Sequence, residues 1–114
     1  MDKTTTISVA KAITETPQPE NEIARGAVEL VHAVGMHARP AVKLTKLAKR
    51  FKARIAVRVA GAVDWIDAKS VAKVMAMRAA QGSVIEFEAQ GADASAAVEA
   101  LTTLVAADFP DTGR

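Results

Sequence analysis

The feature that most constrains this fold is a hydrophobic pattern that changes its period several times within one short stretch of chain. Apolar and polar residues alternate in four segments, which is typical of half-buried strands. Three other segments have the i, i+3, i+4, i+7 spacing of amphipathic helices. The strands are expected at about 26–32, 54–59, 63–67 and 85–89, and the helices at 38–52, 69–80 and 94–105.

This order of elements predicts an α+β domain built as a two-layer open-faced sandwich with the order βαββαβα. Gly61 supplies a turn between the second and third strands, so these two strands should form a hairpin. The helices need one common face of the sheet to bury their apolar stripes. We therefore expect a four-stranded antiparallel sheet with three helices on one face, and a largely solvated opposite face that carries Arg54, Arg58, Glu86 and Glu88.

The chain of 114 residues is long enough for one hydrophobic core. We expect a flexible N-terminal tail at 1–24, a folded domain at 25–109 and a short C-terminal tail at 110–114. The first segment contains Pro17 and Pro19 and has no sustained apolar period. Ile7 and Val9 leave open an additional edge strand.

Composition excludes several classes of site. The chain has no cysteine and only two histidines, so we expect neither a disulfide nor a metal, and no cofactor. No apolar run is long enough to span a bilayer or to serve as a secretory signal, so we expect a cytoplasmic protein that does not bind membranes.

Positive charge is concentrated in one part of the chain. Eight basic residues and no acidic residue lie between positions 37 and 58: Arg39, Lys43, Lys46, Lys49, Arg50, Lys52, Arg54 and Arg58. This run predicts a basic face that attracts an acidic partner. Nucleic acid is the competing partner, but aromatic residues for base stacking are few, so we expect no nucleic-acid binding.

The residues that suggest chemistry lie in the segment 35–40, where His37 falls between a predicted strand and a predicted helix. The first turn of a helix has unpaired N–H groups and the positive end of the helix dipole, so it suits an anion. Arg39 could add a bidentate contact, and Pro40 is well placed in a first turn. The alternative is that His37 is only a polar loop residue and Arg39 a solvated charge.

The segment GMHARPAVKL resembles the active-site segment of HPr, the histidine-containing phosphocarrier family of the bacterial phosphoenolpyruvate-dependent phosphotransferase system. Gly35, His37, Arg39 and Pro40 fall on the family pattern. Segments 67–71 and 81–93 are also similar to the family, and the resemblance covers about 26–107. Arg78 is a departure, because many members have glycine there.

The resemblance implies that His37 accepts a phosphoryl group on Nδ1 from phosphorylated Enzyme I and passes it to IIA-type proteins, with Arg39 orienting the phosphate. Such a protein is a monomeric carrier rather than a conventional enzyme. Its output would be sugar uptake or carbon and nitrogen regulation, which the sequence does not separate.

Ser70 matches the regulatory serine of the family, which HPr kinase/phosphorylase modifies in several bacterial lineages. The same residue type also serves as a helix N-cap, so both interpretations stay open. The alternative function is accordingly a regulatory adaptor that acts through protein binding and is controlled at this serine.

A partner-binding surface is expected around His37. Its candidate residues are Met36, Ala38, Lys46, Lys49, Val71 and Met75. At least one of Met75 and Met77 should instead pack in the core. His32 continues the first strand and is interpreted as structural.

Overall fold

The computed structural model describes residues 22–110 and has the predicted order of elements. They are β1 (Ile23–Glu29), α2 (Ala38–Ala48), β2 (Arg54–Val59), β3 (Ile66–Asp67), α3 (Val71–Ala76), β4 (Val84–Gln90) and α4 (Ala94–Ala106). Strand β1 begins before the expected domain boundary at 25, so Ile23 and Ala24 belong to the sheet rather than to a tail. The suggested edge strand at Ile7 and Val9 lies outside the described residues.

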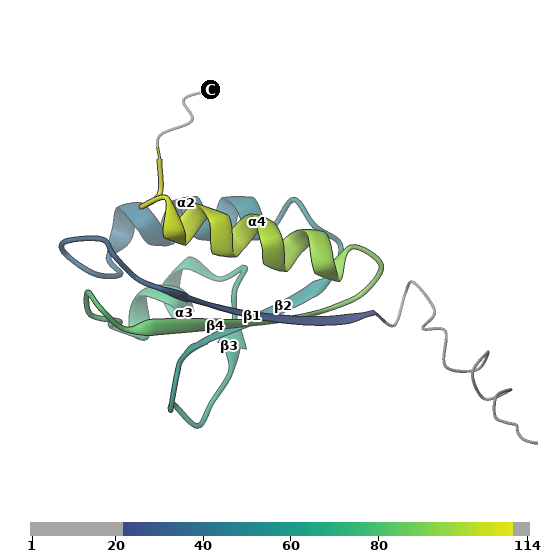
Figure 1. The fold of residues 1–114 in the computed structure, drawn as a ribbon, viewed down its shortest axis with the longest axis horizontal. Coiled ribbons are helices and arrows are strands. Elements are labelled where there is room, and N and C mark those ends of the chain that lie inside the picture. The colour runs from purple at the N-terminus through teal and green to yellow at the C-terminus, as the bar shows by residue number, and fades with distance from the viewer. Residues whose placement is uncertain (1–21, 111–114) are drawn as a thin grey trace, which may run out of the picture.

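The four strands form one antiparallel sheet in the order β1-β4-β2-β3. Central strand β4 pairs Phe87 with Gly26 of β1 and with Val57 of β2. The three helices pack on the sheet, with α2 and α4 side by side in Figure 1. The predicted α+β open-faced sandwich is confirmed.

Alternation along the central strands places their apolar residues in the core between the two layers. Ile55, Val57, Ile85 and Phe87 are almost completely buried, and the helices add Leu44, Ala48, Val74, Ala97 and Leu101 to the same cluster. Gly26 allows α4 to approach β1 closely, because a Cβ at this position would lie 2.7 Å from Val98 Cγ1. The missing side chain of Gly26 therefore sets how closely α4 packs on β1.

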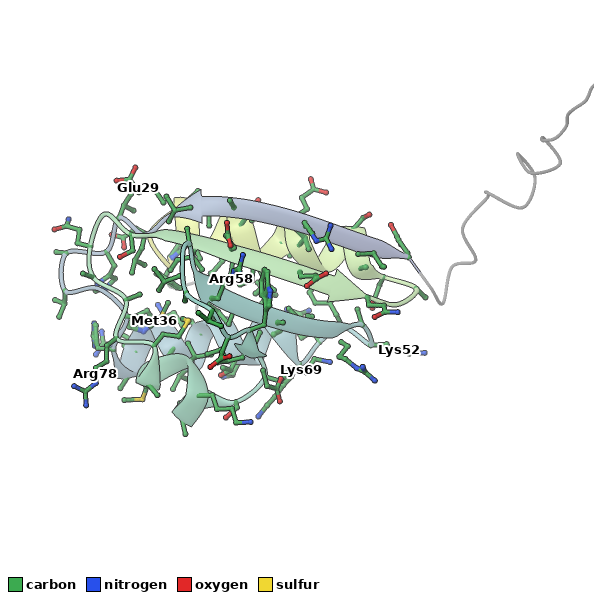
Figure 2. All side chains as sticks on the ribbon, turned by 90° about the horizontal axis from the view of Figure 1, so that it is seen from below. Glu29, Met36, Lys52, Arg58, Lys69 and Arg78 are labelled. Carbon is green, nitrogen blue, oxygen red and sulfur yellow. The ribbon has the colours of Figure 1, made fainter. Side chains whose placement is uncertain are left out.

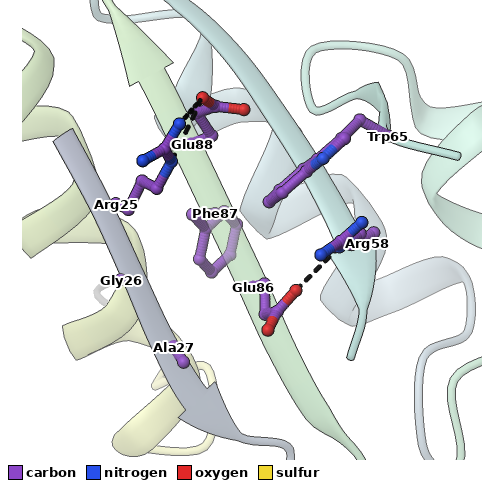
Figure 3. A pocket seen from close by; sticks show the side chains of 8 residues that line it. All are labelled: Arg25, Gly26, Ala27, Arg58, Trp65, Glu86, Phe87 and Glu88. Carbon is purple, nitrogen blue, oxygen red and sulfur yellow. Dashed lines mark hydrogen bonds and ion pairs between the residues drawn. The ribbon is translucent and has the colours of Figure 1, made fainter. Parts of the chain in front are cut away.

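The opposite face of the sheet carries the predicted charged residues, and three of them, Arg58, Glu86 and Glu88, are paired across strands (Figure 3). Arg25 bonds to Glu88 at 2.9 Å, and Arg58 bonds to Glu86 at 2.7 Å. The Cζ atom of Arg58 lies 4.3 Å from the centroid of the Trp65 ring, which is a cation–π geometry. This face is therefore only partly solvated, because Trp65 partly covers the region around Arg58.

Two elements are shorter than the pattern predicts. Strand β3 has two residues instead of spanning 63–67, since Val63 is 87% exposed and lies in the hairpin loop. Helix α3 ends at Ala76 instead of residue 80, because Arg78 adopts a positive φ of 53° that interrupts a right-handed helix.

Helix α2 also ends early, at Ala48 instead of residue 52, although Phe51 still packs against the core. Helix α4 has no side-chain cap at its start. Asp93 occupies the N-cap position, but its carboxylate accepts bonds from the N–H groups of Lys52 and Ala53 at 2.9 and 2.8 Å. Asp93 thus binds the two residues that precede β2 rather than the first turn of its own helix.

Candidate functional site

His37 is the N-cap residue of α2, as expected for a residue between the first strand and the first helix. Its backbone is extended, with φ −135° and ψ −164°, and its carbonyl accepts the N–H of Ala41 at 3.0 Å. The imidazole does not cap the helix. The residue is half-buried, and its Nε2 is a buried polar atom with no hydrogen-bond partner among the described residues.

The loop before His37 is fixed by contacts with the segment after α3. Gly35 has φ 81°, and a Cβ there would lie 2.6 Å from the carbonyl oxygen of Ala79. That oxygen accepts the N–H of Met36 at 2.8 Å. Met36 itself is only 6% exposed, so the expectation of an exposed partner-binding side chain is wrong at this position. Its apolar side chain is instead part of the core that supports the loop.

The first turn of α2 has features that suit an anion. Within residues 22–110 the N–H groups of Ala38 and Arg39 have no hydrogen-bond partner, and Pro40 has no N–H to satisfy. This turn contains no acidic residue. Arg39 is exposed, and neither of the two ion pairs in the described region involves it. Two backbone donors and a free guanidinium thus accompany the His37 imidazole.

Several exposed apolar side chains belong to the elements around this turn. Val34 is 71% exposed, Val42 41% and Met75 39%. Val34 and Val42 were not among the predicted contact residues, although Val42 lies off the i, i+3, i+4 stripe that contains Ala41, Leu44 and Ala48. Ala38 is exposed, whereas Val71 and Met77 are partly buried and pack against the core, as expected for at least one of Met75 and Met77.

The basic run does not form a single face. Lys46 and Lys49 are exposed on α2, but Lys43 donates to the carbonyl of Phe109 at 3.0 Å. Arg58 lies on the opposite face of the sheet and is paired with Glu86. In Figure 2, Lys52 lies far from Met36 and Arg78, which mark the end of the molecule near the His37 loop. The prediction of one basic face is therefore wrong, and only part of the run lies on α2.

Ser70 is the N-cap of α3, and its hydroxyl accepts the N–H of Lys73 at 3.3 Å. The capping interpretation of Ser70 is therefore confirmed. Its phosphorylation stays a prediction.

The His32 ring is a neighbour of the His37 ring that the sequence did not reveal. Its ring centroid lies 5.0 Å from that of His37, with an interplanar angle of 63°. The two residues are five positions apart and belong to no common periodic element. The Gly35 turn brings them together, and the spacing alone carries no signal of this contact.

Two further observations concern the described region. Residues 22–110 contain no cluster of three or more histidine, aspartate or glutamate side chains that could hold a metal ion. No helix in this region is long and apolar enough to cross a membrane.

Comparison with known proteins gives the same result at the levels of sequence and structure. The family model described as "PTS HPr component phosphorylation site" matches residues 24–107. The phosphocarrier protein HPr of Neisseria meningitidis is 37% identical over 79 residues, which cover 69% of this chain and 86% of the relative. The phosphocarrier protein NPr of Proteus mirabilis is 34% identical over 84 residues, which cover 74% of this chain and 92% of the relative.

Solved structures that resemble this chain are also HPr phosphocarrier proteins. The phosphocarrier protein HPr from Bacillus anthracis matches with a TM-score of 0.68 and 33% identity, covering 75% of this chain and 99% of that chain. A structure of HPr from Thermoanaerobacter tengcongensis matches with a TM-score of 0.70 and 30% identity, covering 75% of this chain and 94% of that chain. This chain therefore belongs to the HPr family of phosphotransferase-system phosphocarriers, which transfer phosphoryl groups through a histidine.

Proposed function

We propose that His37 is the phosphoryl acceptor, that it reacts through Nδ1, and that it takes the phosphoryl group from phosphorylated Enzyme I and delivers it to IIA-type proteins in the cytoplasm. The observation that supports this assignment most strongly is the burial of His37 Nε2. Since Nε2 faces the protein, Nδ1 is the ring nitrogen left for a phosphoryl donor.

The proposed phosphoryl transfer uses the His37 ring, two backbone N–H groups and the Arg39 guanidinium. In the neutral ring the proton lies on Nε2 and the lone pair on Nδ1 attacks phosphorus, while the bond between phosphorus and the donor breaks. The charge of the transferred group is then met by the N–H groups of Ala38 and Arg39 at the start of α2. Arg39 adds a guanidinium that can bind two phosphate oxygens together.

The partner surface is proposed to combine apolar contacts with charge. Val34, Val42 and Met75 supply exposed apolar area, and Lys46 and Lys49 supply positive charge on α2. A partner with an acidic rim around an apolar centre fits this arrangement.

The proposal is tested by incubating the protein with phosphoenolpyruvate and Enzyme I and mapping the phosphate. We expect one acid-labile phosphate on the peptide that contains His37, and its transfer to an added IIA-type protein. Absence of label, or label that is stable in acid, would reject the assignment. The regulatory adaptor remains the alternative in that case.

A further inference from the structure

The two histidines of this chain pack against each other, and the proposed mechanism uses only one of them. His32 comes just after β1 and faces the His37 ring in a T-shaped arrangement, with centroids 5.0 Å apart. Edge-to-face packing at such a separation is a favourable geometry for aromatic rings. His32 is only partly exposed, so its ring is held beside His37 rather than extended into solvent.

His32 is itself held by contacts on two sides. Its Nδ1 accepts the N–H of Val34 at 3.3 Å, which requires a lone pair on that nitrogen and leaves the proton of the neutral ring on Nε2. The ring of Phe109 lies on another side, with a centroid distance of 6.0 Å and an interplanar angle of 68°.

Phe109 is in turn fixed to the rest of the domain. Its side chain is only 4% exposed, and its carbonyl oxygen accepts a bond from Lys43 Nζ on α2. The three rings and Lys43 thus connect the segment after α4 to helix α2 and to its N-cap residue, His37.

His37 needs such a support because no hydrogen bond from the described residues fixes its ring. A half-turn about the Cβ–Cγ bond would place the carbon Cδ2 where Nδ1 now lies, and the terminal torsion of histidine is roughly two-fold. Nε2 has no partner that would resist this rotation. Packing must therefore determine which edge of the ring is presented outward.

We propose that His32 is a positioning residue for His37: its ring, backed by Phe109, holds the His37 imidazole with Nδ1 presented to the phosphoryl donor. This role rests on the proposed function of His37 and adds a residue to it. It depends on the aromatic ring of His32 and not on the hydrogen bond to Val34.

Two variants separate these contributions. His32→Phe keeps a ring of similar shape and loses the acceptor for the Val34 N–H. His32→Asn loses the ring and keeps a side-chain oxygen that can accept the N–H two residues on. For each folded variant we would record the ¹⁵N signals of the His37 ring without phosphate, and the single-turnover rate of phosphoryl acceptance from Enzyme I.

We expect His32→Phe to retain the His37 signals and a rate within about twofold of wild type. His32→Asn should shift or broaden the signals and lower the rate by roughly three- to tenfold, the range expected for one aromatic pair. If His32→Asn does not fold, Phe109→Leu should produce a smaller change in the same direction.

A His32→Asn variant with wild-type signals and rate would overturn the proposal, and so would a His32→Phe variant as slow as His32→Asn. If the wild-type protein accepts no phosphate at all, the proposed function fails. The ring signals of the unphosphorylated protein still decide whether His32 orients His37.

Discussion

Helices α2 and α3 both begin after an extended N-cap residue, but their first turns are completed in different ways. At α3 the Ser70 hydroxyl accepts the Lys73 N–H, so the helix start is partly satisfied from within. At α2 the His37 side chain caps nothing, and the N–H groups of Ala38 and Arg39 have no partner within residues 22–110. An absent N-cap bond typically costs about 1 kcal/mol of stability. The start of α2 is thus less stable than a capped helix start, but its two N–H groups can still donate to an external anion.

The largest effect is expected when the start of α2 is made to resemble that of α3. His37→Ser should abolish acid-labile phosphorylation, because no imidazole remains. It should leave the free energy of unfolding unchanged or raise it by up to about 1 kcal/mol through a new cap on the Arg39 N–H, since Pro40 has no N–H at the position that corresponds to Lys73. Thermal unfolding and a phosphorylation assay measure the two effects. His37→Ala is the matched control, without phosphorylation and without the added cap. Acid-labile label on folded His37→Ala would contradict the assignment.

The guanidinium beside this helix start should have the second-largest effect. Arg39→Ala should slow single-turnover phosphoryl acceptance by about one to two orders of magnitude without abolishing it, since the backbone donors remain. Arg39→Lys should recover only part of the rate, because an ammonium cannot make the planar two-point contact. Equal rates for the Lys variant and wild type would show that only the charge matters.

A smaller effect is expected farther along α2. Lys49→Glu should lower the rate of association with Enzyme I by several-fold at low salt, because it reverses an exposed charge. The loss should shrink as salt rises toward 1 M, where the Debye length is about 3 Å. Stopped-flow transfer at several partner concentrations is the measurement. A defect that persists at saturating partner would assign Lys49 to the transfer step itself.

The start of α3 should behave in the opposite way to that of α2. Ser70→Ala should destabilise the protein by about 1 kcal/mol through loss of the cap and leave phosphoryl acceptance unchanged. Ser70→Asp should keep the cap and lower acceptance, because a new negative charge on this surface would repel an acidic partner. If Ser70→Asp accepts phosphate at the wild-type rate, Ser70 acts only as a cap.

The start of α4 is a third case, and it predicts a dependence of stability on pH. The hydrogen bond from the Lys52 N–H, assisted by that from Ala53, lowers the pKa of Asp93 below its usual value of 3.8. The stabilisation from Asp93 is therefore complete above this usual value and is lost as pH falls through the lower pKa of the folded state. Chemical denaturation of wild type and Asp93→Asn should differ near neutral pH and converge in strong acid. A constant difference would mean that the carboxylate charge is not involved.

The sequence predicted those parts of the molecule that depend on local periodicity. The alternation in 85–89 predicts β4 because a half-buried strand requires it, and Gly35 to Pro40 predict the start of α2. The end of α3 was missed because Arg78, a non-glycine residue, adopts φ 53°. Arginine at that position does not signal a left-handed conformation, whereas the glycine that many family members have there would have done so.

Two of the missed contacts join segments that are far apart in the sequence, and the third is made within the loop before α2. Asp93 reaches the entry of β2, Lys43 reaches Phe109, and the Gly35 turn brings His32 against His37. Met36 was expected at the surface because it adjoins His37, yet its side chain turns into the core. A one-dimensional pattern identifies the residue that can react, whereas its surroundings depend on the packing of distant elements.

The most direct test of the account is to identify the nitrogen that carries the phosphate. The protein would be labelled with ¹⁵N, phosphorylated with phosphoenolpyruvate and Enzyme I, and examined for coupling between phosphorus and the histidine ring nitrogens. We expect coupling to Nδ1 of His37 and no coupling to its Nε2. Phosphate on Nε2 of His37, or on His32, would contradict it.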